Sequence, residues 1–279
     1  MTTQTEEVLG RLLDLPDVRE AVEAAREACT ELRWHQALRR RTKEARAESL
    51  IRAARASAAI EGSRYPDDLF RDVARGAAQF PDDASGRLAL GTVRLLTEAQ
   101  HWEAKVSTSP AQVLARLHTV VAADLLSADA LGRPRRPGEL PGDGIGEPDT
   151  APSGAALQSR LGGIHDLMAA PASAPALLVA ALVHAEVATA RPFLAGNGLL
   201  ARALARTIVI GRGLDPMGVV VWEAATLDAG PAYARALMAY TQGSPEAVGA
   251  WLKQCADLVV KGAAHGRSVC DAILAGRLT

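Results

Sequence analysis

Residues 175–211 read PALLVAALVHAEVATARPFLAGNGLLARALARTIVIG, which is two apolar runs separated by a short turn. The first run is apolar on every side of a helix, and such a helix is normally surrounded by others in a protein core. The turn contains Gly196-Asn197-Gly198, residue types that tolerate positive φ. The stretch therefore predicts two central helices, over 175–190 and 198–211, joined by a tight loop.

The composition of the whole chain agrees with a helical protein. Of its 279 residues, 48% are hydrophobic and only 4% are aromatic, and Ala and Leu dominate the apolar set. Ala and Leu favour helix, whereas strands are rich in β-branched and aromatic residues. We therefore expect an all-α fold, and we exclude a β-sandwich and a doubly wound sheet.

Helical spacing of apolar residues continues on both sides of the central stretch. Pro16 divides the first helical region, residues 6–30, and a longer helix follows from about Glu31 to Glu61 with Gly62 as its C-cap. The other predicted helices span residues 67–78, 84–106, 110–126, 155–169, 223–241 and 245–275. Residues 127–154 are rich in Gly and Pro and have no helical period, so we expect a functional or mobile loop there.

The charge and the cysteine content exclude several classes of protein. The 31 basic and 32 acidic side chains leave a net charge of -1, which argues against a globally basic nucleic-acid binder. The three cysteines, Cys29, Cys255 and Cys270, form no metal-binding pair and no even-numbered disulfide framework. The polar N-terminus and the interrupted apolar run at 174–190 predict neither a signal peptide nor a membrane span. We expect a cytoplasmic protein without a membrane partner.

The turn at Gly196-Asn197-Gly198 precedes the second central helix. Unpaired backbone N–H groups and the helix dipole favour an anion at such an N-terminus. Arg202 follows one turn into the helix and could point back at the same anion. The pattern indicates a phosphate site formed by Gly196, Asn197, Gly198 and Arg202, although taken alone it is also typical of a plain turn between helices.

With these residues in place, the chain resembles the Fic (filamentation induced by cAMP) family. The family signature runs His-Pro-Phe-x-(Asp/Glu)-Gly-Asn-Gly-Arg-x-x-Arg, and this chain reads RPFLAGNGLLAR from Arg191 to Arg202. His184 and the Gly-Pro-rich segment before the motif also resemble family features. The resemblance implies a Fic-like bundle of about eight helices over residues 51–279. It also implies a short flap or β-hairpin segment before the motif and an N-terminal helical extension over residues 1–50.

A second family motif lies upstream. Ser57-Ala58-Ala59-Ile60-Glu61-Gly62 fits the family's autoinhibitory pattern (Ser/Thr)-x-x-x-Glu-(Gly/Asn). The resemblance implies that Ser57, Glu61 and Gly62 are inhibitory residues and that Glu61 pairs with Arg202. The dipole at a helix C-terminus disfavours a carboxylate, and an arginine partner would offset that cost. Without the resemblance, Glu61 is interpreted as a solvated surface carboxylate.

Three polar positions of the signature are changed in this chain. In the family, the histidine is the general base in the transfer of AMP or a related phosphate-containing group to a protein hydroxyl, the acid holds Mg²⁺, and the first arginine clamps phosphate. Here Arg191 offers no acceptor for a proton, Ala195 offers no metal ligand and Leu199 carries no charge. The resemblance therefore implies a pseudoenzyme without normal AMPylation activity. It would bind ATP or another nucleotide, with weak Mg²⁺ binding or none and no protein metal site.

The sequence leaves the ligand and the activity open. Either a nucleotide or another phosphorylated ligand binds without Mg²⁺, or Glu61 fills the site permanently. The alternatives to a pseudoenzyme are an active Fic-type transferase with altered chemistry and a module that binds a protein or a nucleic acid. A protein partner is expected for a regulatory or complex-forming subunit. Nucleic acid would contact the basic stretch Arg39–Arg55, a pattern that more often forms a solvated helix face.

Overall fold

The computed structural model describes residues 2–277, which form helices and no strand. Within this range there are twelve α-helices and four short 3₁₀ helices, so the all-α prediction is confirmed with more helices than expected. The α-helices are α1 (Thr2–Leu13), α2 (Val18–Arg33), α3 (Thr42–Ile60), α4 (Asp67–Ala74), α5 (Ala84–Ala99), α6 (Pro110–Ala122), α7 (Gly154–Met168), α8 (Ala176–Ala190), α9 (Asn197–Gly211), α10 (Trp222–Ala229), α11 (Pro231–Tyr240) and α12 (Pro245–Leu274). The 3₁₀ helices are η1 (Gln36–Arg39), η2 (Gln100–Lys105), η3 (Ala128–Ala130) and η4 (Pro148–Thr150).

The helix expected from Glu31 to Glu61 is interrupted between α2 and α3. His35 is extended (φ -58°, ψ 137°), and its Nδ1 accepts a hydrogen bond from the backbone N of Ala37 at 3.3 Å. This bond caps η1 instead of continuing the helix. The helix expected over 223–241 likewise divides into α10 and α11, because Gly230 adopts φ 52° and ψ -129°, far from helical values.

The prediction of a β-hairpin before the signature loop, which is the stretch 191–196 between α8 and α9, is also wrong. Residues 127–153, called the flap segment below, contain only turns, η3 and η4. Prolines and glycines interrupt the regular backbone that strand pairing needs. The glycines at positive φ include Gly132, Gly138, Gly144 and Gly146. The predicted boundary between residues 50 and 51 falls inside α3, and the division into an extension and a Fic-like domain stays a prediction.

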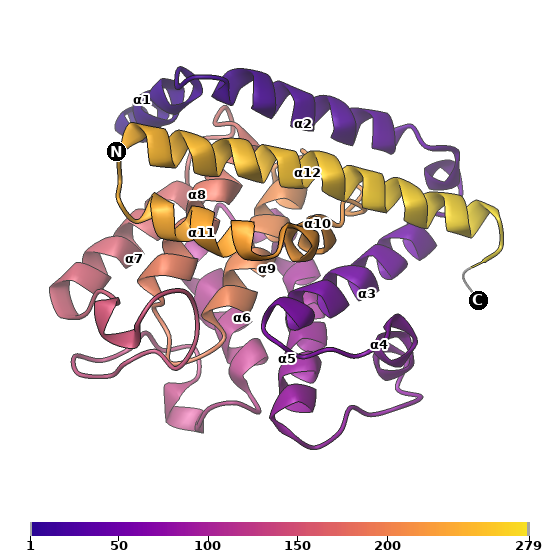
Figure 1. Ribbon diagram of the computed structural model, residues 1–279, viewed down its shortest axis with the longest axis horizontal. Coiled ribbons are helices and arrows are strands. Elements are labelled where there is room, and N and C mark those ends of the chain that lie inside the picture. Colours follow the sequence, from indigo (N-terminus) through magenta and orange to yellow (C-terminus); the bar gives the residue numbers. More distant parts are fainter. Residues whose placement is uncertain (1, 278–279) are drawn as a thin grey trace.

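The two central helices predicted from the sequence are the core of the bundle. α8 packs along α9, with α7, α11 and α12 around it (Figure 1). Every α8 residue except Ala176 and Glu186 is buried. The Nε1 of Trp251 in α12 donates a hydrogen bond to the Ala181 carbonyl at 2.8 Å, which fixes α12 on α8. No helix within residues 2–277 has the length and apolar character needed to cross a bilayer.

α2 and α12 lie side by side along one edge of the molecule (Figure 1). α12 approaches the start of α10 closely because it carries two glycines there. A Cβ at Gly262 would lie 2.7 Å from the Trp222 backbone, and one at Gly266 would lie 2.3 Å from the Val219 carbonyl oxygen. Val221 N donates to the Gly262 carbonyl at 3.0 Å. This contact positions α10, which borders the cavity described below.

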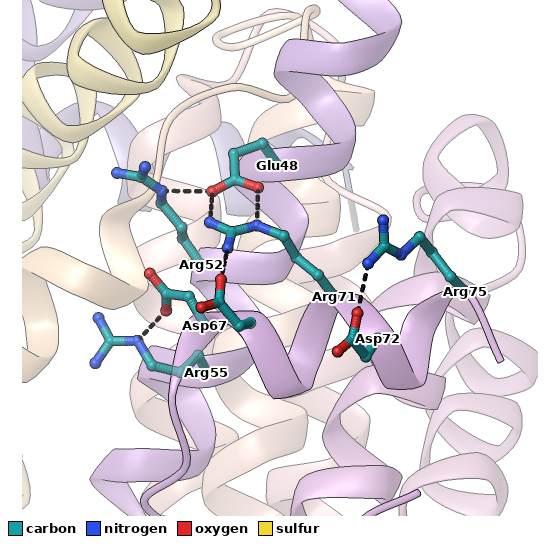
Figure 2. A network of polar contacts seen from close by, with 8 residues as sticks. Glu48, Arg52, Arg55, Asp67, Arg71, Asp72 and Arg75 are labelled. Atoms are coloured by element: carbon teal, nitrogen blue, oxygen red, sulfur yellow. Dashed lines mark hydrogen bonds and ion pairs between the residues drawn. The ribbon is translucent and has the colours of Figure 1, made fainter. Parts of the chain in front are cut away.

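Many of the basic side chains of α3 are paired within the fold, as Figure 2 shows. The buried Glu48 accepts hydrogen bonds from Arg52 at 2.9 Å and from Arg71 at 2.7 and 2.8 Å. Arg55 pairs with Asp67 at 2.8 Å. These ion pairs tie α3 to α4. The basic stretch therefore presents fewer free charges for nucleic-acid phosphates than its sequence indicates.

Candidate functional site

The loop between α8 and α9 is held together by the side chain of Asn197. Its Oδ1 accepts a hydrogen bond from Phe193 N at 3.0 Å, and its Nδ2 donates to the Phe193 carbonyl at 2.9 Å. Arg191 at φ 45° and Gly196 at φ 81° turn the backbone between the helices. A left-handed arginine costs about 1–2 kcal/mol, so its neighbours must hold it there.

The end of α3 meets α9 through a buried arginine. Arg202, only 2% exposed, donates from NH2 to Glu61 Oε1 at 2.7 Å and from Nε to Ser57 Oγ at 2.8 Å. Its NH2 also donates to the Ser57 carbonyl at 3.1 Å. Burial disfavours the guanidinium charge, but Glu61 and Tyr233 together outweigh this and raise the pKa of Arg202. Gly62 follows at φ 91°, where a glycine ends the helix at little cost.

A cavity of about 350 Å³ opens beside this pair. Glu61, Gly198, Arg202 and Tyr233 form its polar wall, and Ile60, Ile145 and Leu227 are among its apolar lining. A Cβ at Gly198 would lie 2.3 Å from Glu61 Oε1, so the carboxylate can rest against α9 because residue 198 is a glycine. The volume lies in the range of small-molecule sites, about 300–1,000 Å³.

His184 contacts Tyr233, one of the residues that line the cavity. It is fully buried on α8, and its Nε2 shares a hydrogen bond of 2.7 Å with the Tyr233 hydroxyl. Burial lowers the pKa of His184 to about 3, and the nearby Arg202 charge acts in the same direction. A neutral histidine bonded to a buried tyrosine joins α8 to α11, which is a structural role.

Arg191 is turned toward the flap segment. Its NH1 donates to the Gly146 carbonyl at 2.9 Å, and its NH2 donates to the Glu147 carbonyl at 2.7 Å and to Thr150 Oγ1 at 3.1 Å. A Cβ at Gly144 would lie 2.7 Å from Arg191 Cδ, so the flap segment passes the arginine at a glycine. Arg191 therefore acts as a clamp on the flap segment.

The flap segment reaches back with an arginine and an aspartate of its own. The buried Arg135 donates to the carbonyls of Arg191 at 2.8 Å and Pro152 at 2.9 Å. Asp143 accepts hydrogen bonds from the backbone N of Gly196, from Asn197 N at 3.3 Å and from Asn197 Nδ2 at 2.8 Å. Two of the backbone N–H groups predicted to bind phosphate, those of Gly196 and Asn197, are thus bonded to the protein's own carboxylate.

At position 195, where the resemblance implies a metal-binding acid, the alanine has no side-chain oxygen. Leu199, at the first arginine position, is a buried apolar residue. Among residues 2–277, no group of three or more His, Cys, Asp and Glu side chains could hold a metal ion.

Comparison with solved structures identifies the fold of this chain. No protein-family model and no curated protein matches the chain. A solved Fic family protein from Desulfovibrio desulfuricans matches with a TM-score of 0.75 and 19% identity, over 92% of this chain and 75% of the other. The chain has the Fic fold. Fic-1 from C. elegans matches with a TM-score of 0.64 and 18% identity, and the match covers 93% of this chain and 73% of the Fic-1 chain.

Within the Fic fold, the predicted site residues separate into two groups. Glu61, Gly198 and Arg202 come together on one wall of the cavity, and Ser57 accepts a hydrogen bond from Arg202. Arg191, Gly196 and Asn197 face the flap segment instead. Sequence reasoning missed Arg135 and Asp143. The available signal was an aspartate between two glycines, Gly142-Asp143-Gly144, which allow the backbone to bring a carboxylate close to a helix N-terminus.

The buried histidine gives a pH-dependent prediction. Unfolded histidine has a pKa near 6.5, whereas that of folded His184 is about 3, so the unfolded state binds the proton first. Stability from neutral His184 is complete above pH 6.5 and is lost as the pH falls toward 3. Between pH 7 and 5 we expect the wild type to lose about 2 kcal/mol relative to His184→Gln.

Urea unfolding of both proteins at pH 7 and pH 5 measures this difference. His265→Gln is the matched control, since His265 is paired with Asp228 at the protein surface and not in the core. An unchanged difference between wild type and His184→Gln at the two pH values would contradict the neutral, buried assignment.

Proposed function

We propose that this chain binds a nucleotide or a related phosphorylated ligand, lacks ordinary AMP transfer, and is held closed by Glu61. The observation that carries the proposal is the ion pair of Glu61 and Arg202 on the wall of the cavity, with Ser57 bonded to the same guanidinium. A buried guanidinium whose partner is a carboxylate would exchange it readily for phosphate, because both anions accept its hydrogen bonds. Glu61 would then compete with the ligand for Arg202.

The chemistry of residue 191 supports the loss of transfer. A general base must accept a proton, and a guanidinium has no acceptor atom and stays charged at physiological pH. Arg191 is in addition engaged with two carbonyls and a hydroxyl of the flap segment. It is therefore proposed to be a structural residue at a position that is catalytic in active relatives.

The missing acid supports ligand binding that does not depend on metal. Mg²⁺ on nucleotide phosphates is normally held by one or two carboxylates. Ala195 supplies none, and Leu199 removes a further charge from the same turn. We therefore expect Mg²⁺ to change affinity little. A protein partner remains part of the proposal, as an expectation for a subunit without catalysis.

Calorimetric titration of ATP into the wild type and Glu61→Gly, each with and without Mg²⁺, tests the proposal. We expect Glu61→Gly to bind about 10–100-fold more tightly than the wild type, since freeing Arg202 removes a competing charge-assisted hydrogen bond worth about 1.5–3 kcal/mol. The control is Glu44→Gln, which removes a negative charge from the exposed far end of the same helix.

The outcomes separate the interpretations. Equal and weak binding by all three proteins would refute the nucleotide site. Tight binding by Glu61→Gly only when Mg²⁺ is present would contradict the metal-independent part. Transfer of labelled phosphate by the wild type onto itself would favour the alternative, an active transferase with altered chemistry.

A further inference from the structure

The flap segment and the signature loop are joined by charged side chains that cross in both directions. Arg191 of the loop bonds to carbonyls of the flap segment, and Arg135 of the flap segment bonds to carbonyls of the loop. Asp143 adds the third connection, with its carboxylate on the N–H groups of Gly196 and Asn197. The amide of Gly142 also donates to the Leu194 carbonyl at 2.8 Å.

The carboxylate of Asp143 is bound as a free anion would be. It receives two backbone N–H groups at the start of α9 and the Nδ2 of Asn197, a set of donors that suits a carboxylate or a phosphate oxygen. No lysine or arginine of the described residues donates a hydrogen bond to it or forms an ion pair with it. Its position therefore depends on the helix N-terminus and on the flap segment that carries it.

We propose that Asp143 is a built-in stand-in for an anion, and that this latch must open before a phosphate can occupy the N-terminus of α9. This regulation rests on the proposed function, because it takes phosphate to be the group that replaces the carboxylate. It adds a second gate to the Glu61 gate. The two carboxylates come from different parts of the chain and block different donors, Arg202 in one case and backbone N–H groups in the other.

A tethered carboxylate is an effective competitor. A group carried on a short connection has an effective concentration in the millimolar range at its site, so a free ligand must exceed that competition to bind. Burial weakens this competition because it raises the pKa of Asp143 and so disfavours its ionised form. The Asn197 hydrogen bond lowers that pKa, and the Glu61 charge raises it.

The substitution in the signature fits this device. An acidic residue at position 195 would stand next to Gly196, whose N–H donates to Asp143. Two carboxylates at one helix N-terminus repel each other, and that would favour an open flap segment. Ala195 removes this repulsion, so the lost metal ligand and the occupied N-terminus are consistent with each other.

Hydrogen exchange followed residue by residue tests the latch without any ligand. In Asp143→Ala we expect the amides of Gly142 and Gly196 to exchange about 10-fold faster than in the wild type, because their hydrogen bonds depend on the docked flap segment. Asp149→Ala is the matched control, an exposed carboxylate of the same segment. Asp143→Asn keeps the size of the side chain and is expected to give an intermediate rate. Unchanged rates in Asp143→Ala, or equal acceleration in Asp149→Ala, would overturn the latch.

Titration of ATP into Glu61→Gly and into the double variant Glu61→Gly/Asp143→Ala then tests the gate. We expect the double variant to bind about 10-fold more tightly. If Glu61→Gly binds ATP and the double variant binds no better, the latch proposal fails and the proposed function stands. If neither binds ATP while exchange is accelerated, the proposed function fails and the latch is supported as a contact of the fold.

Discussion

The triple variant Glu61→Gly/Arg191→His/Ala195→Asp is expected to modify itself with labelled ATP. Its rate should exceed that of Glu61→Gly/Arg191→Gln/Ala195→Asp by about 10²–10⁴-fold, the usual contribution of a general base. Histidine supplies the acceptor atom that arginine lacks. It also tolerates the left-handed backbone found at residue 191 (φ 45°) better than most side chains. Ala195→Asp supplies a carboxylate for Mg²⁺ and repels Asp143 from the helix N-terminus.

The Arg191→Gln protein is the appropriate comparison because both substitutions release the same hydrogen bonds to the flap segment. The two proteins then differ chiefly in the presence of a base. The measurement is the rate of label incorporation from ATP labelled on its α-phosphate. Equal rates in the two variants, or a wild-type rate that already matches the histidine variant, would contradict the proposal that Arg191 prevents AMP transfer.

Arg206→Ala is expected to lower the free energy of unfolding by about 3–5 kcal/mol, the usual cost of removing one partner of a buried ion pair. Arg206 donates to Glu223 at 3.2 Å and to the carbonyls of Val220 and Gly218, each at 2.8 Å. Glu223 is completely buried, and its second oxygen accepts no hydrogen bond from a described residue. Without Arg206, Glu223 would lose its ion-pair partner.

The loss should depend on pH. Burial already raises the pKa of Glu223, and the Arg206 charge opposes that rise, so the variant raises it further. A carboxyl with a folded pKa above its unfolded value binds protons preferentially in the folded state, so stability increases as the pH falls toward that pKa. Urea unfolding should therefore show a smaller deficit at pH 5 than at pH 8. In Arg206→Ala/Glu223→Gln, this pH dependence should become smaller, with a remainder from the buried Asp215, whose pKa the Arg206 charge also lowers. A deficit equal at both pH values in Arg206→Ala would contradict the buried charge.

Much of the fold was predictable along the chain. Apolar periodicity and local breakers act over a few residues, so the division at Pro16, the end of α3 before Gly62 and the apolar α8 followed from the sequence. The interruption between α2 and α3 was not predicted, because the residues around His35 have no strong helix breaker. Its extended backbone is supported by a hydrogen bond between its ring and Asp271 of α12, at 3.0 Å.

The candidate site was predictable where two signals converged on one contact. Glu61 and Arg202 each belong to a recognisable motif, and their ion pair joins residues 141 positions apart. Asp143 belongs to no such motif. Aspartate is common in loops, and the residues near Asp143 in the sequence do not predict which helix N-terminus its carboxylate contacts.

Residue types and their spacing carry information about what each segment can do: form a helix, end it, accept a proton or hold a charge. The Arg191 side chain has no proton acceptor and the Ala195 side chain has no oxygen; these are such local properties, and no packing arrangement alters them. Which groups meet depends on how the helices pack. Arg191 bonds to a carbonyl 45 positions away, and Asp143 accepts from a backbone N–H 54 positions away, so the folded bundle, by placing the flap segment over α9, selected those partners.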